Sequence, residues 1–187
     1  MLEEVNFLVE TAEEAMEKAL DHLNKELGKI TTGKATPAIV RDLLVNYYGT
    51  PTPMNQVANI STSDARSLVI QPWEKSMLAP IERSIFEANL GVTPMNDGEV
   101  VRLSFPPLTE ERRRDLVKKA KALGEDAKVS SRSSRREAME GIKKAVKEGF
   151  SEDEGKKREE TVQQLTDKHI KKIDELLDIK EKEIMTV

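Results

Sequence analysis

The chain of 187 residues contains no cysteine, which excludes a disulfide framework and any metal site built on thiolates, and which fits a reducing compartment. Only two histidines, His22 and His169, are available for a metal centre or a general base. The short motifs of phosphate-binding loops, zinc proteases, serine hydrolases and dinucleotide-binding folds are all absent. We therefore expect a protein that is not an enzyme and that needs no metal ion or cofactor.

Aromatic residues and long apolar runs are also scarce. Aromatic residues make up 4% of the chain and charged residues 34%, a composition that favours long helices with exposed faces. No apolar run approaches the roughly 18 residues that a membrane-spanning helix requires. The acidic segment Met1–Glu4 lacks the profile of a signal or transit peptide. We therefore expect a cytoplasmic protein without a membrane anchor.

The net charge of −4 is unevenly distributed along the chain. Residues 1–28 carry a net charge of −6, residues 29–108 are neutral, and residues 149–187 carry −3. Residues 109–148 hold 13 basic and 8 acidic side chains, a net charge of +5. A segment of this kind can present a basic surface to phosphate groups although the whole chain is acidic.

Residues 109–148 are predicted to form one long helix of about 60 Å with two stripes. The first stripe has helical spacing and is expected to pack against a partner helix; it comprises Leu116, Ala120, Leu123, Ala127, Ser130 and Ser134. The second, here named the basic ridge, comprises Arg114, Lys118, Lys121, Lys128, Arg132, Arg135 and Arg136. Since seven residues make almost two helical turns, the cations should line up, roughly opposite the first stripe.

A basic stripe on a helix is most often a solvated face, but the basic ridge has a feature that favours ligand binding. Arginine is concentrated in Ser131–Arg136, and the guanidinium group binds phosphate oxygens in a fork that lysine cannot form. The ridge therefore indicates a nucleic-acid interface.

Two further helices are predicted by apolar periodicity, over residues 1–30 and from Ser151, which begins a capping box, to about Ile184. His169 falls on the apolar stripe of the last helix, where we expect a hydrogen-bonded or boundary histidine rather than a metal ligand or a general base. The three long helices cannot bury their stripes alone, so they should form a bundle.

The residues between the first two long helices show strand-like apolar runs and turn residues in place of a long helical period. They are expected to form a small β/α/β domain, with Gly49–Pro53 as a turn and with Trp73 in the core rather than in an exposed contact. The expected strands are Leu43–Tyr48, Val57–Ile60, Ser67–Ile70 and Val100–Phe105, and the expected helix is Ser76–Asn89.

The predicted fold class is therefore α+β, with two domains in an elongated, bent molecule. Residues 1–30 and 107–187 form the three-helix bundle, and residues 31–106 form the inserted domain. The chain must leave the bundle and return to it, and both connections contain glycine or proline. These two segments should act as a two-stranded hinge.

Several motifs in this order resemble those of the bacterial ribosome recycling factor family over essentially the whole chain. The matching motifs are Lys29–Pro37, Tyr47–Pro53, Pro106–Arg113, Arg132–Arg136 and His169–Ile173. Each motif is weak alone, but together they are highly specific.

The resemblance implies an L-shaped monomer with dimensions like those of a tRNA. Members of the family act with elongation factor G and GTP to split the post-termination ribosome into subunits and to release mRNA and deacylated tRNA. The helical domain would dock on 23S rRNA of the large subunit, and the inserted domain would swing when the GTPase pushes on it.

The resemblance also assigns roles to residues. Arg132 and Arg135 would contact rRNA phosphates first and Arg136 next, and the geometry of the ridge adds Lys128 and Lys121. The hinge would comprise Thr32, Gly33, Lys34, Phe105, Pro106 and Pro107. Two departures from the family pattern, Thr31 and Lys34 in place of the usual arginines, should weaken any RNA contact at that end of the first helix.

Two other functions are compatible with the sequence. A helical adaptor or chaperone would explain the long charged helices, although not the arginine cluster. A ribosome-bound silencing factor would bind the ribosome without splitting it.

Overall fold

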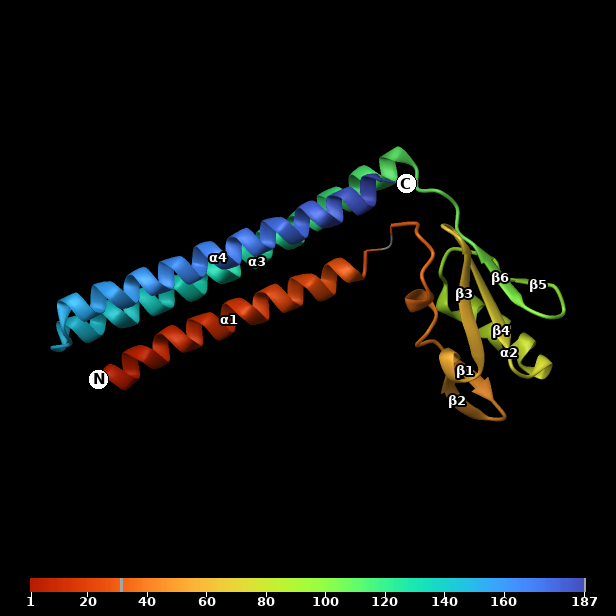
Figure 1. Cartoon of the computed structure of the whole chain (residues 1–187), viewed down its shortest axis with the longest axis horizontal. Helices are drawn as coiled ribbons and strands as arrows, with labels where there is room; N and C mark the ends of the chain where they lie inside the picture. The colour runs from red at the N-terminus through yellow and green to blue at the C-terminus, as the bar shows by residue number, and fades with distance from the viewer. Residues whose placement is uncertain (31, 187) are drawn as a thin grey trace. The chain divides into compact units, whose positions relative to one another are not determined.

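The computed structural model describes residues 1–30 and 32–186, which divide into two compact units. The helices are α1 (Leu2–Gly28), α2 (Leu78–Ala88), α3 (Glu110–Lys147) and α4 (Glu152–Met185). The strands are β1 (Leu44–Tyr47), β2 (Thr50–Pro53), β3 (Ala58–Asp64), β4 (Ser67–Pro72), β5 (Met95–Asn96) and β6 (Val101–Ser104). Helices α1, α3 and α4 form the first unit, and Thr32–Thr109 form the second (Figure 1). The predicted α+β class is confirmed.

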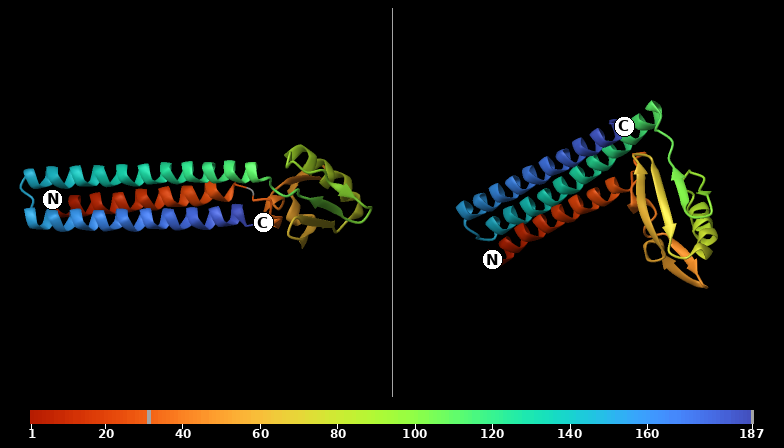
Figure 2. Two further views of the ribbon diagram at one scale, coloured as in Figure 1. Left: turned by 90° about the horizontal axis from the view of Figure 1, so that it is seen from above. Right: turned by 45° about the vertical axis from the view of Figure 1, so that its right-hand side comes forward.

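The first unit is a bundle of three long helices that lie side by side (Figures 1 and 2). The three helices contain 27, 38 and 34 residues, and all three were expected from their apolar periodicity. The N-terminus of α1 lies at the same end of the bundle as the connection between α3 and α4 (Figure 1). Helices α3 and α4 are therefore antiparallel, and α1 runs parallel to α4.

The buried face of α3 differs in part from the predicted stripe. Its buried residues are Leu116, Ala120, Gly124, Ala127, Ser131, Ala138 and Ile142. The expectation that Ser130 is buried is wrong, because Ser130 is exposed and Ser131 is fully buried in its place. Ser134 is only half-buried, and its hydroxyl donates to the carbonyl of Ser130 at 3.1 Å. A seven-residue spacing drifts around a helix of 3.6 residues per turn, which explains the error.

Glycine lets α3 approach both of its neighbours closely. A Cβ atom on Gly124 would lie 2.3 Å from a methyl carbon of Leu177 on α4. A Cβ atom on Gly141 would lie 2.7 Å from a methyl carbon of Leu8 on α1. The two glycines face different helices, so α3 is closely packed on two sides of the bundle.

Polar side chains join α4 to α1 at two levels. Near the start of α4, the Nε atom of Arg158 donates to Asn6 at 3.2 Å. Further along, His169 is almost completely buried, with its Nδ1 atom 2.7 Å from the carbonyl of Leu165 and its Nε2 atom 2.8 Å from Oε1 of Glu17. Both partners are acceptors, so this geometry is fully satisfied when both ring nitrogens carry a hydrogen. Of the two expected environments, hydrogen-bonded or at the boundary, the structure shows the first.

Helix α4 begins with half of the predicted capping box. The hydroxyl of Ser151 accepts a hydrogen bond from the backbone N–H of Glu154 at 3.4 Å. The carboxylate of Glu154 binds Lys157 at 3.1 Å and Arg158 at 2.7 Å. Both ion pairs lie within α4, and Arg158 also contacts Asn6 of α1.

The second unit is built on a four-stranded antiparallel sheet with the order β3-β4-β6-β5. A separate hairpin pairs β1 with β2, and helix α2 contacts β1 and β6. The core of this unit joins strand residues such as Leu68, Ile70 and Leu103 with Ile81 and Ile85 of α2, and all five are almost completely buried. The predicted strands and helix of the insert are confirmed to within a few residues.

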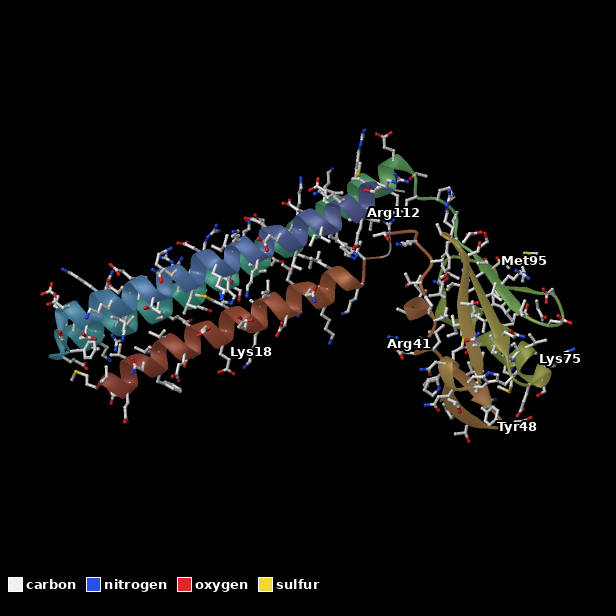
Figure 3. All side chains as sticks on the ribbon, in the orientation of Figure 1. Lys18, Arg41, Tyr48, Lys75, Met95 and Arg112 are labelled. Carbon is white, nitrogen blue, oxygen red and sulfur yellow. The ribbon has the colours of Figure 1, made fainter. Side chains whose placement is uncertain are left out.

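Two expectations for this unit are wrong. Gly49–Pro53 is not simply a turn, because Thr50–Pro53 forms β2 and only Tyr48 and Gly49 connect it to β1. Trp73 is 66% exposed and does not belong to the core. It directly precedes Glu74, whose carboxylate accepts hydrogen bonds from Tyr47 at 3.1 Å and Tyr48 at 2.6 Å. Tyr48 lies at the end of the β1–β2 hairpin (Figure 3).

Among the residues described, no helix is both long enough and apolar enough to cross a lipid bilayer.

The buried hydroxyl of Ser131 leads to a prediction about stability. Ser131 has 0% exposure, and its Oγ atom has no hydrogen-bond partner among the described residues. A buried hydroxyl without a partner is unfavourable, so Ser131→Ala should raise the free energy of unfolding. The control is Ser133→Ala, an exposed position of the same helix that reports the helix-propensity gain alone. We expect Ser131→Ala to exceed the control by about 1 kcal/mol in urea unfolding; equal values would contradict this account.

The contact between His169 and Glu17 predicts a pH dependence. The hydrogen bond from His169 holds the pKa of the Glu17 carboxyl below its ordinary value of 4.5. A carboxyl with a lowered pKa in the folded state stabilises the fold above its unfolded-state pKa, and this contribution is lost as the pH falls through the lowered value. Glu17→Ala should therefore cost about 1 kcal/mol at pH 7, a low figure because the carboxylate is half exposed.

The difference in the free energy of unfolding between Glu17→Ala and the unmutated protein should shrink below about pH 4. Chemical denaturation at several pH values measures this difference. Glu14→Ala is the control, since the polar partner of Glu14 among the described residues is the exposed Lys18, at 3.2 Å. A difference that stays constant down to pH 2 would show that Glu17 acts through packing alone.

Candidate nucleic-acid interface

Four cations of the basic ridge are available to an external ligand. They are exposed, and none of them forms a hydrogen bond or an ion pair within the described part of the chain; they are Lys118, Lys121, Arg132 and Arg136. Arg132 directly follows the buried Ser131, which places the two side chains about 100° apart around the helix axis. The packing of α3 in the bundle thus holds these four cations toward solvent, and Figure 3 shows side chains pointing outward along all three helices of the bundle.

Lys128 has a different environment. Its side chain is only 16% exposed, and its ammonium group lies 2.7 Å from the carboxylate of Asp174 on α4 and 3.8 Å from that of Glu125. The expectation that the whole basic ridge lies opposite the buried face is therefore wrong at this position. The charge of Lys128 is matched by a partner across the α3–α4 contact, and it holds the two helices together.

Arg135 also lies on the α4 side of the ridge and is half-buried. Its Nη1 atom donates to Oε1 of Gln163 on α4 at 3.4 Å. The amide nitrogen of Gln163 in turn donates to Asp167 at 2.9 Å. Arg135 forms no ion pair within the described residues, so its positive charge is not neutralised by a carboxylate in contact with it.

Arg114, at the start of α3, is paired along its own helix. Its guanidinium group lies 2.7 Å from the carboxylate of Glu110, one turn earlier. Both side chains are largely exposed, so this pair contributes little to stability and a competing anion can displace it. Of the seven ridge cations, only Arg114 and Lys128 are therefore ion-paired within the described residues.

The predicted hinge residues all lie in the second unit, next to its two chain connections to the first. Gly33 has a φ of +78°, and a Cβ atom built on it would lie 3.2 Å from Cγ of Leu108, so the two connections touch. Thr32 is half-buried and Lys34 is exposed, whereas Thr31 lies outside the described residues. Pro106 and Pro107 are exposed and belong to no helix or strand.

Phe105 is the anchored end of the second connection. Its backbone N–H donates to the carbonyl of Arg66 at 2.7 Å, and its side chain packs against the core of the second unit. In the same way, the backbone N–H of Ala35 donates to the carbonyl of Ala65 at 2.9 Å. Both connections are thus fixed to the turn between β3 and β4, just inside the predicted hinge.

The sequence did not reveal which residues of α4 contact the cations of α3. Asp174 follows Lys128 by 46 residues and Gln163 follows Arg135 by 28, so no local sequence pattern predicts either contact. The antiparallel pairing of two predicted helices is the one signal that could have suggested them. In the described residues, no group of three or more histidine, aspartate or glutamate side chains is arranged to hold a metal ion.

Comparisons with known proteins place this chain in a family. The family profile described as "Ribosome recycling factor" matches residues 23–185. Among similar curated proteins are the ribosome-recycling factors of Flavobacterium johnsoniae and Christiangramia forsetii, which are 54% and 53% identical over the full length of both chains. The corresponding protein of Desulforamulus reducens is 46% identical over 98% of this chain and 100% of its own.

Solved structures agree with this relationship. A solution structure of a ribosome recycling factor matches with a TM-score of 0.81 and 41% identity, and it covers all of both chains. A second match, with a TM-score of 0.62 and 41% identity over 97% of this chain and 98% of that one, is to the T. thermophilus factor placed with E. coli elongation factor G on the E. coli post-termination complex. This chain belongs to the ribosome recycling factor family.

Proposed function

We propose that this protein splits post-termination ribosomes into subunits together with elongation factor G and GTP, in the cytoplasm, and that the basic ridge of α3 docks on large-subunit rRNA. Membership of the family, in which the factor is not an enzyme, supports the first part. The observation that carries the second part is that Arg132 and Arg136 point to solvent without a partner in the described residues. Contacts of this kind bind phosphates and position a protein without reading base sequence.

The proposed RNA-contacting set is Arg132, Arg135, Arg136 and Lys121. Arg132 and Arg136 come first because their guanidinium groups are exposed and can bind phosphate oxygens in pairs. Lys121 continues the set along the same face. Lys128 is left out, because an RNA phosphate would have to displace Asp174 from its ammonium group.

The proposed mechanism combines a rigid body with a flexible connection. The bundle docks through several phosphates, and it occupies space that a contact between the ribosomal subunits requires. We place the hinge at Thr32–Lys34 and Phe105–Pro107, where two short segments outside regular structure connect the units. Force from the GTPase on the second unit would then displace the docked bundle.

The direct test follows subunit splitting by light scattering. Purified protein, post-termination ribosomes, elongation factor G and GTP should together lower the scattered intensity, and omission of any one component should abolish the change. Binding without a change in scattering would indicate a silencing factor and would contradict the proposal. A helical adaptor would fail to sediment with ribosomes at all.

The docking surface is tested by Arg132→Ala. Loss of one charge-assisted phosphate contact should weaken binding to large ribosomal subunits roughly tenfold, equivalent to about 1.4 kcal/mol. The slope of log affinity against log salt should fall by about one unit. Sedimentation at several KCl concentrations measures both values.

The matched control for this experiment is Lys144→Ala. Lys144 is an exposed cation of the same helix, about 120° around the axis from Arg132, so it should not reach the same RNA surface. The melting temperatures of both variants should stay close to that of the unmutated protein. Equal loss of affinity in both variants would point to general charge attraction and would argue against a defined site.

A further inference from the structure

We propose that Gln163 of α4 is a positioning residue for Arg135, which it holds in place while leaving its positive charge free for RNA. This inference rests on the proposed docking of α3 on rRNA and concerns the same surface. It assigns a role to a side chain outside the basic ridge and on a different helix.

The contact between the two side chains has a defined direction. Nη1 of Arg135 donates to Oε1 of Gln163 at 3.4 Å, and Nε2 of Gln163 donates to Asp167 at 2.9 Å. Asp167 can only accept, so it draws the amide nitrogen of Gln163 toward itself and turns the amide oxygen toward Arg135. The arrangement Asp167–Gln163–Arg135 thus orients the guanidinium group from α4.

The chemistry of the partner decides what this arrangement does. A neutral amide oxygen restrains one N–H group of Arg135 and leaves its charge and its other N–H groups available. A carboxylate at the same place would form an ion pair and would compete with a phosphate for the same donors. Restraint also reduces the side-chain entropy that docking would otherwise lose.

Lys128, seven residues before Arg135 on the same side of α3, has a charged partner instead of a neutral one. Its partner on α4 is a carboxylate, Asp174, at 2.7 Å, and its side chain is only 16% exposed. Across the α3–α4 contact, a carboxylate therefore neutralises Lys128, whereas a neutral amide binds Arg135. This contrast is the reason to assign Gln163 to the binding surface rather than to the stability of the bundle.

The test compares two charge-introducing variants of neighbouring glutamines. Gln163→Glu places a carboxylate against Arg135, whereas Gln164→Glu adds the same charge to the exposed next position of α4, about 100° around the helix. Binding to purified large ribosomal subunits is measured against KCl concentration. We expect Gln163→Glu to lose roughly tenfold in affinity and about one unit of salt slope, as Arg135→Ala does. Gln164→Glu should bind within about twofold of the unmutated protein.

Two further variants separate positioning from repulsion. Gln163→Ala should lose about threefold in affinity with an unchanged salt slope, because Arg135 keeps its charge but is no longer oriented. In the Arg135→Ala background, Gln163→Glu should cause no further loss, which is the non-additivity expected of two groups that act together. Gln163→Ala also keeps the inference testable if Gln163→Glu does not fold.

The outcomes distinguish this inference from the proposed function. If Arg132→Ala and Arg135→Ala bind as the unmutated protein does, the docking surface itself is wrong. If both lose affinity while Gln163→Glu behaves like Gln164→Glu, the docking surface stands and the role of Gln163 is refuted. Additive losses in the double variant would also refute it.

Discussion

The close packing of α3 against both α1 and α4 is the constraint on which the rest of the first unit depends. Gly124 and Gly141 leave room for leucine side chains of the two neighbouring helices, and any larger residue there would have to displace them. Once these two contacts are made, the rotation of α3 about its own axis is determined. The face that carries Arg132 must then point toward solvent. The orientation of the proposed binding surface therefore follows from the packing of the helices.

Within this frame, polar contacts between the helices have two distinct roles. Some join the helices, as Arg158 does with Asn6 and as His169 does with Glu17. The pair formed by Lys128 and Asp174 also belongs to this group, because the lysine is mostly buried. Exposed charges contribute little to folding, so the exposed cations of the basic ridge can serve binding at little cost in stability. Stability and binding are thus assigned to different side chains of one helix.

The sequence was sufficient to predict the three long helices, since apolar periodicity over 27 to 38 residues is a strong signal. It was less reliable for the orientation of individual side chains. The serine run shows why: Ser130 and Ser131 differ by about 100° around the helix, and their chemistry does not indicate which one is buried. Trp73 is a similar case, because a large aromatic residue suggests a core position and only the tertiary structure leaves it exposed.

The candidate site was predictable in its location and not in its electrostatics. The arginine cluster of α3 is visible in the sequence, but the charge that it presents depends on what α4 places beside each cation. Asp174 removes Lys128 from the surface, whereas Gln163 leaves the charge of Arg135 uncompensated. A count of basic residues on α3 alone therefore overstates the charge available for RNA. The effective surface belongs to the pair of antiparallel helices, and the choice between a carboxylate and an amide on α4 is as much a part of it as the arginines themselves.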